Sequence, residues 1–399
     1  MHSGNRLGSV GANCDRAARK AKRDHRIDLV RGFALATIFI NHMPGNWLAD
    51  WTSRNFGFSD AAEVFVLLAG YAAALAFYPT YVKSNLQTVT VKAGRRAAVV
   101  YGAHLMTTLA AIVMFSAFRS FATTAEAQDL IGMGPVLDDP VTSLVAVLFG
   151  GFQLSYFNVL PLYVVLLALV PGLVWLAEKD LRLVGAVSAA TYLLTNVGGL
   201  SLPNFHNFDG WFFNPLAWQC LFVAGLALGI GRCRGQSASY HRVLFKLALG
   251  YLVFSAVWMT GDFGRSVGAG VVPEWLGSLE KPNLPVVRLL HIFALAYVVC
   301  HCRVWQWLAR VPAEFVLTRM GRNSLPVFMA GSLLSMAGWI VSTQVQGGPV
   351  MDAMVAAAGI SGMAMLALWL ENSLYLPRVR WTYCAQLAGR SKGLAHTIQ

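Results

Sequence analysis

Ten apolar stretches decide what this chain can fold into, because each is about as long as the roughly 20-residue helix that crosses the hydrocarbon core of a bilayer. They are 27–43, 60–79, 97–118, 157–177, 182–200, 214–231, 243–260, 288–308, 324–342 and 350–370. Only 13% of the 399 residues are charged and 56% are hydrophobic, whereas about a quarter of the residues in a soluble domain are charged. The sequence therefore predicts an all-α polytopic integral membrane protein with about ten transmembrane helices.

The basic residues predict how these helices are oriented. If the chain starts in the cytoplasm, most of its 31 Lys and Arg fall in inner segments. The outer loops then hold only Arg54, Arg119, Arg265 and Lys281. This positive-inside pattern favours ten spans with both termini in the cytoplasm, and it makes the short run 141–153 re-entrant or interfacial. The net charge of +12 is thereby an orientation signal, and we expect no nucleic-acid partner.

The chain divides into a membrane domain with a tail at each end. Residues 1–26 are basic and predict a disordered cytoplasmic tail without a signal-peptide cleavage pattern. Residues 27–377 form the predicted transmembrane domain, and 378–399 form a second cytoplasmic tail. The six cysteines contain no CxxC pair, so we expect neither a disulfide framework nor a metal site.

Polar residues within the first apolar stretch predict a functional site. Arg31 and His42 are eleven residues apart, so on a helix they differ by only about 20° in direction and by about 16 Å in height. Asp28 falls on the same face, and Asn41 adjoins His42. Charged groups are costly in lipid, so this face should turn toward the protein interior. The alternative, in which Arg31 snorkels and His42 only ends a helix, leaves the shared face unexplained.

Three further polar groups adjoin apolar stretches. Asp60 and Glu63 open the second stretch. The sequence KAGRR places Arg95 and Arg96 at the cytoplasmic end of the third, with His104 two to three turns further along. These arginines are either topology anchors or a clamp for the phosphates of an anionic cofactor. The third group, Arg288 and His291, lies at the outer end of the eighth stretch.

Arg288 and His291 are one helical turn apart. Snorkelling explains Arg288 alone, whereas a histidine so close beside it also fits a binding site.

Several sequence blocks resemble a known family. Arg31 and His42 resemble the R-x10-H signature of the membrane-bound acyltransferase-3 superfamily, and FVLLAGY at 65–71 resembles its F-x-L-S-G-F/Y element, with Ala69 where serine is commoner. Within the superfamily, the chain resembles the OpgC family, named for the osmoregulated periplasmic glucan succinyltransferase. The blocks are RIDLVRGFAL at 26–35, SDAAEVFVLLAGY at 59–71, FNVLPLYVVLLALVP at 157–171, FNPLAWQCLF at 213–222, RLLHIFALAY at 288–297 and GRNSLPVF at 321–328.

The resemblance implies O-acyl transfer across a bacterial inner membrane. The co-substrate would be an acyl-CoA, succinyl-CoA in the activity that names the family, with no permanently bound cofactor and no metal. The acceptor would be a hydroxyl of a periplasmic glucan or another envelope polysaccharide. His42 would act as general base, because imidazole titrates near neutral pH, and Glu63 or Asp60 would set its tautomer.

The remaining candidate residues take supporting roles in that scheme. Arg31 would hold the acyl-CoA or orient the site, with Asp28 as its partner, because an unpaired buried charge is costly. Arg95 and Arg96 would bind the CoA phosphates, with His104 nearby. Arg288, beside His291, would meet the distal carboxylate of a succinyl group.

Two other classes of protein remain open. Ten spans with intramembrane Asp, Glu and His also describe a proton-coupled transporter, although no inverted repeat is visible in the sequence. A binding or assembly subunit of an envelope polysaccharide machine would need no chemistry of its own. Acyl transfer to a different envelope acceptor is a further alternative within the leading class.

Overall fold

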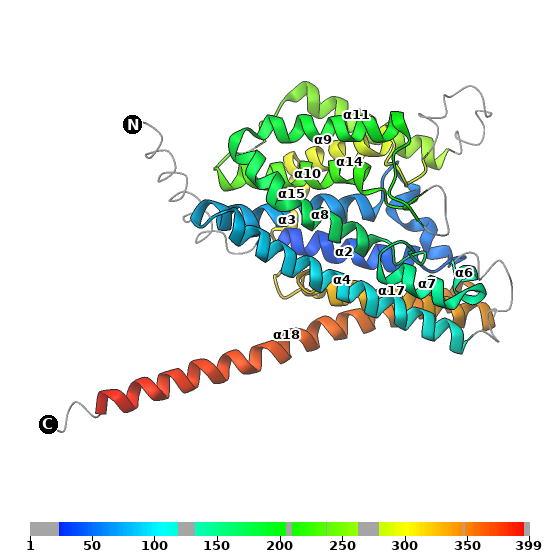
Figure 1. Ribbon diagram of the computed structural model, residues 1–399. Coiled ribbons are helices and arrows are strands. Elements are labelled where there is room, and N and C mark those ends of the chain that lie inside the picture. Colours follow the sequence, from blue (N-terminus) through cyan, green and yellow to red (C-terminus); the bar gives the residue numbers. More distant parts are fainter. Residues whose placement is uncertain are drawn as a thin grey trace.

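The computed structural model describes residues 24–118, 132–204, 210–236, 238–261, 279–345 and 348–394, and all its regular elements are helices (Figure 1). The longer helices are α2 (His25–Asn41), α3 (Ala61–Lys83), α4 (Leu86–Ala117), α8 (Val159–Lys179), α9 (Leu181–Gly198), α10 (Pro215–Cys233), α11 (Arg242–Thr260), α14 (Val286–His301), α17 (Ser324–Val345) and α18 (Gly348–Leu394). The shorter ones are α6 (Gly134–Asp138), α7 (Pro140–Leu148), α15 (Arg303–Leu308), α16 (Val316–Arg322) and the 3-10 turns η1 (Trp47–Trp51) and η2 (Ser53–Asn55).

The predicted all-α polytopic membrane fold is confirmed, since each of the ten predicted spans coincides with one of the longer helices. Among the described helices, seven are long and apolar enough to cross a membrane: α3, α4, α8, α10, α11, α17 and α18. Helices α2 and α14 have 17 and 16 residues. Such helices rise only about 25 Å, slightly less than the hydrocarbon core.

Three predicted boundaries differ from the structure. The predicted span 288–308 is broken at Cys302, whose backbone is extended, into α14 and α15. The last helix, α18, runs far past the predicted end at residue 370, to Leu394. The predicted N-terminal tail through Arg26 ends inside α2, which begins at His25, and residues 1–23 lie outside the described part of the chain.

The short apolar run 141–153 forms α7, a helix of nine residues. Nine residues rise only about 14 Å, so α7 is too short to cross a membrane. In Figure 1, α2 begins and α18 ends on the same side of the bundle. This arrangement fits an even number of crossings, and the cytoplasmic location of that side stays a prediction from the charges.

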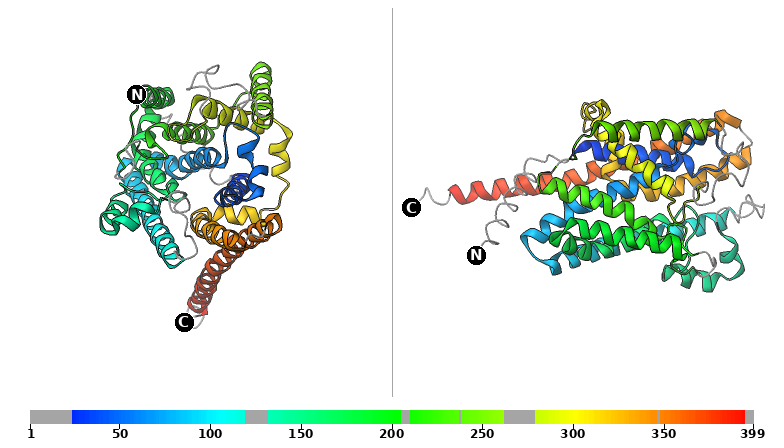
Figure 2. Two further views of the ribbon diagram at one scale, coloured as in Figure 1. Left: turned by 90° about the vertical axis from the view of Figure 1, so that its right-hand side faces the viewer. Right: turned by 90° about the horizontal axis from the view of Figure 1, so that it is seen from above.

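Glycines bring α2 and α3 into close contact with their neighbours. A Cβ at Gly32 of α2 would overlap the carbonyl oxygen of Leu317 in α16, and one at Gly321 would overlap that of Asp28. Gly70 of α3 lies equally close to the backbone of α10 at Phe222. Small residues allow such close backbone approach between membrane helices. In the end-on view of Figure 2, α2, in blue, lies within the bundle.

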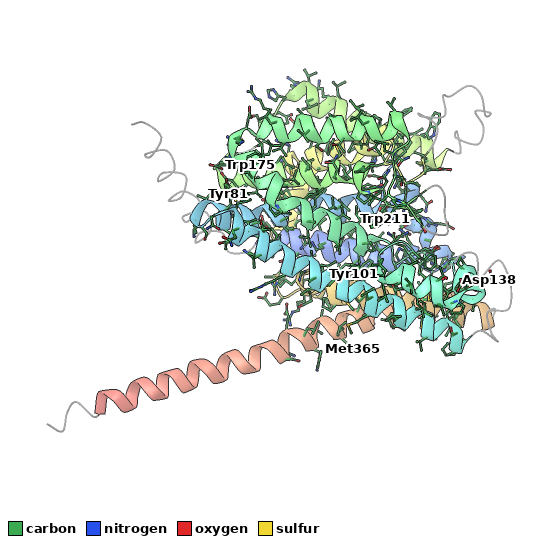
Figure 3. The ribbon with its side chains drawn as sticks, viewed as in Figure 1. Tyr81, Tyr101, Asp138, Trp175, Trp211 and Met365 are labelled. Carbon is green, nitrogen blue, oxygen red and sulfur yellow. The ribbon has the colours of Figure 1, made fainter. Side chains whose placement is uncertain are left out.

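Aromatic side chains lie at both ends of the bundle. Figure 3 places Tyr81 and Trp175 at the end where α2 begins, and Trp211 toward the opposite end. Trp175 is exposed, and the Lys179 ammonium lies 3.6 Å from the centre of its ring. Such aromatic and basic residues mark the two membrane–water interfaces.

Candidate active site

The two ends of α2 are fixed by side chains outside the helix. Asp24 caps the first turn by accepting a hydrogen bond from the Arg26 backbone, and it forms a 2.6 Å ion pair with the Arg26 guanidinium. At the other end, the Asn46 amide donates to the carbonyl oxygens of Ile40 and Met43. His42 occupies the C-cap. Both predicted site residues, Arg31 and His42, therefore sit on one helix whose position is fixed at each end.

Arg31 lines a cavity of about 490 Å³. Lys92, Arg95 and Arg96 of α4 line the same cavity, and none of the described residues around it is acidic. The Arg31 guanidinium donates to the Leu68 carbonyl oxygen at 3.1 Å. The structure thus brings the predicted Arg31 together with the predicted Arg95 and Arg96, which are more than 60 residues away in the sequence.

The rest of this cavity, which we call the inner cavity, is apolar. An alanine stripe on α3, formed by Ala69, Ala72, Ala73 and Ala76, makes one wall. The Lys92 ammonium donates to the Ala76 carbonyl oxygen at 2.7 Å, at the same wall. Small side chains leave room for a ligand, and cations balance an anionic group. The inner cavity therefore suits an anionic molecule with an extended apolar or neutral arm.

His42 lies in a separate, much smaller pocket of about 10 Å³, which has room for one water-sized group. Ser332, Ser335 and Trp339 of α17 line this His42 pocket together with Tyr156. The centres of the His42 and Tyr156 rings are 4.7 Å apart. The pocket therefore holds an imidazole against an aromatic ring and two hydroxyl-bearing side chains.

Sequence reasoning missed Tyr156. Its φ is +68°, which places a non-glycine residue in the left-handed region, and such strain is concentrated at functional sites. Burial raises the pKa of the Tyr156 hydroxyl, and the charge of Arg54 lowers it by less. The hydroxyl is therefore neutral at neutral pH. Nothing in the sequence SYFN distinguishes this tyrosine from an interfacial aromatic residue, so no signal for it was available.

Asp60 and Glu63 begin α3 as a capping box. The Asp60 carboxylate accepts from the Ala62 backbone, and the Glu63 carboxylate accepts from the Asp60 backbone at 2.9 Å. Asp60 also pairs with Lys281 at 2.5 Å, and Glu63 pairs with Arg288 at 2.5 Å. These four residues form the outer ion cluster. Both carboxylates contact cations and backbone amides, and their support of the His42 tautomer stays a prediction.

Arg288 and His291 belong to this same region. Arg288 is 6% exposed, and it also donates to the Leu279 carbonyl oxygen. The Nδ1 atom of His291 lies 2.7 Å from the Ser59 hydroxyl. A substrate contact for either residue stays a prediction, since neither lines the inner cavity or the His42 pocket.

A sequence model of the OpgC protein family matches residues 23–374, which include every residue of the inner cavity, the His42 pocket and the outer ion cluster. The chain belongs to the OpgC family. No curated protein matches it, and no solved structure does. The resemblance seen in the sequence is therefore confirmed at the level of this family, and membership implies that the protein is a membrane acyltransferase.

The other predicted residues of this OpgC-family chain lie near the site without lining it. His104 is fully buried on α4, with Nδ1 3.3 Å from the Thr108 hydroxyl. The Asn41 side-chain oxygen accepts from the Thr52 hydroxyl at 2.7 Å, and Asp28 is buried. Their roles in cofactor binding and support stay predictions. Among the described residues, no cluster of His, Cys, Asp or Glu could hold a metal ion.

Proposed function

We propose that this OpgC-family protein transfers a succinyl group from succinyl-CoA to a hydroxyl of a periplasmic glucan at the bacterial inner membrane. The observation that carries the proposal is the placement of Arg31 and His42 on one helix. Arg31 lines the inner cavity with Lys92, Arg95 and Arg96, and His42 lies in its own pocket further along α2. The cavity provides a place for an anionic donor, and the pocket provides a base.

The inner cavity supports the binding of acyl-CoA from the cytoplasm. Arg95 and Arg96 would bind the CoA phosphates, because guanidinium groups match phosphate oxygens in geometry and charge. The alanine stripe would accommodate the extended arm of the donor. Arg31 would contact the arm within the cavity and balance the negative charge of the donor there.

His42 would supply the base for the transfer step. A ring nitrogen of His42 would take the proton from the acceptor hydroxyl while its oxygen attacks the thioester carbonyl carbon. The new C–O ester bond would form and the C–S bond would break, and the proton would pass to the departing CoA thiolate. A base in this position contributes about 10²–10⁴-fold to the rate. The small pocket has space for one hydroxyl beside the imidazole.

Mass spectrometry of periplasmic glucans tests this proposal. Cells that express the protein should yield glucans with the mass increment of a succinyl group, and cells without it should not. The variant His42→Ala should succinylate glucans roughly 10²–10⁴-fold more slowly and still accumulate in the membrane. His301→Ala is a matched control, because His301 lies at the end of α14 against the Tyr297 carbonyl oxygen. Unmodified glucans in every strain would disprove the proposed acceptor.

A further inference from the structure

The inner cavity and the His42 pocket share one face of α17. Ser324, Leu325 and Phe328 line the cavity, and Ser332, Ser335 and Trp339 line the pocket. Ser324, Phe328, Ser332, Ser335 and Trp339 follow one another at steps of three or four residues, so they form one stripe along the helix. Phe328 and Ser332 are one turn apart, which is about 6 Å of rise. The two spaces are therefore separated by a layer about one side chain thick.

The start of α8 and the residues before it also separate the inner cavity from the His42 pocket. Leu160, at the start of α8, lines the inner cavity, and Tyr156, four residues earlier, lines the His42 pocket. On α3, Phe65 is the cavity residue nearest the outer end of the helix, where Asp60 and Glu63 lie. Three elements thus place Phe65, Leu160 and Phe328 at the outer end of the cavity.

These residues close the cavity with apolar contacts. Phe65 and Phe328 are 9% and 4% exposed, and their rings are stacked with centres 6.5 Å apart. On α2, the buried Leu35 follows Arg31 by one turn. An apolar constriction of this kind excludes water and ions. The proposed transfer, with donor and acceptor on opposite sides of a membrane, needs such a seal, because a continuous wet path would leak ions.

Phe65 and Phe328 are held differently. The Tyr163 hydroxyl donates to the Phe65 carbonyl oxygen at 3.0 Å, and the Tyr163 ring packs edge-on against the Phe65 ring. Phe328 follows the break between α16 and α17, where Asn323 has non-helical dihedral angles. Phe65 is thus fixed by a hydrogen-bonded neighbour, whereas Phe328 lies in the second turn after an interruption of the helix.

We propose that Phe328 is the gating residue between the inner cavity and the His42 pocket, and that the acyl group reaches His42 along the face of α17 when the Phe328 ring swings aside. This inference rests on the proposed acyl transfer for its biological meaning. Its structural content, an apolar layer between two spaces in which Phe328 is the movable member, is tested without any acyl donor. The gate passes a narrow acyl group and keeps the membrane sealed when it is closed.

Cysteine accessibility measures the gate directly. The six native cysteines are replaced, and Ser332→Cys places a thiol in the His42 pocket. An anionic methanethiosulfonate reagent is added to the cytoplasmic face of inside-out vesicles, from which the cationic cavity attracts it. With Phe328 present, labelling should be slow. Adding Phe328→Ala should raise the labelling rate by roughly tenfold or more, because an apolar barrier to a charged reagent has been removed.

Phe77→Ala is the matched control. Phe77 is also a buried phenylalanine in the wall of the inner cavity, but it lies beside Lys92, whose ammonium is 5.3 Å from the centre of its ring. This variant should leave the labelling rate unchanged. Equal acceleration by both variants, or fast labelling with Phe328 intact, would overturn the proposal.

Two further measurements keep the result interpretable. Labelling of each variant after unfolding in denaturant should be equal, which shows that the thiol is present and reactive, and equal thermal unfolding shows that each variant is folded. If Phe328→Ala does not fold, Phe328→Met keeps much of the volume and should give an intermediate rate. Failure of glucan succinylation with intact gating would contradict the proposed function alone, whereas normal succinylation with no effect of Phe328 on labelling would contradict the gate alone.

Discussion

Four charged side chains line the inner cavity and four form the outer ion cluster, yet the two groups have opposite surroundings. In the cavity, Lys92, Arg95 and Arg96 are exposed, and among the described residues neither Arg95 nor Arg96 pairs with a carboxylate. In the cluster, two carboxylates meet two cations, and the Glu63 carboxyl is 0% exposed. Exposed cations such as Arg95 and Arg96 around open space favour an anionic ligand, whereas balanced buried pairs favour a fixed structure.

The largest expected effect is on the stability of the cluster. Arg288→Met removes the cation that meets Glu63 and leaves a buried carboxylate without its partner. Loss of one partner of a buried pair costs about 3–5 kcal/mol. Thermal unfolding of the purified protein in detergent should show this loss. The double variant Arg288→Met with Glu63→Leu should recover most of it. If the Arg288→Met protein were as stable as the parent, the outer ion cluster would not be the structural element that distinguishes it from the inner cavity.

The cavity should respond in substrate binding and keep its stability. Replacement of both Arg95 and Arg96 by alanine removes charge-assisted contacts that contribute about 1.5–3 kcal/mol each. The KM for the acyl donor should therefore rise by roughly ten- to a hundredfold per contact, with unfolding unchanged. Arg303→Ala, at an exposed arginine that begins α15, is the control and should change neither quantity. A stability loss without a KM effect would reassign the two arginines to the fold.

A smaller effect is expected for Tyr156. The ring of Tyr156 packs on that of His42, and an aromatic contact contributes about 0.5–1.5 kcal/mol. Tyr156→Ala should therefore lower kcat by roughly two- to tenfold. Tyr156→Phe retains the ring and should stay close to the parent rate. If Phe at this position were as damaging as Ala, the hydroxyl and not the ring would be the important group.

The smallest effect separates exposed from buried members of the cluster. Lys281 is 33% exposed, and its partner Asp60 keeps a second cation, Arg288, at 3.5 Å. Lys281→Met should therefore cost only about 0.5–1 kcal/mol in unfolding free energy, in the range of solvent-exposed ion pairs. Added salt should reduce even this difference. A loss as large as that of Arg288→Met would show that solvent exposure does not rank the members of the cluster.

The placement of Arg31 and His42 on one helix could be predicted, because it depends on local periodicity. The spacing of Arg31 and His42 needs only the pitch of a helix, and the basic cluster at Arg95 and Arg96 is contiguous. The outer ion cluster could not be predicted, since Glu63 and Arg288 are 225 residues apart and meet only through the packing of α3 and α14. Tyr156 depends on the left-handed backbone conformation of one loop residue, which no composition or periodicity encodes.

The close packing of Gly32 against α16 and the capped ends of α2 leave that helix little freedom to slide or turn. Consequently the distance from Arg31 to His42 is fixed by eleven residues of helix. The arm of a donor bound in the inner cavity would have to span this distance. In the proposed transfer, a donor whose arm is too short would stop before His42, however tightly its charged end binds. Under the proposed function, the donor would therefore be selected partly by the length of its arm.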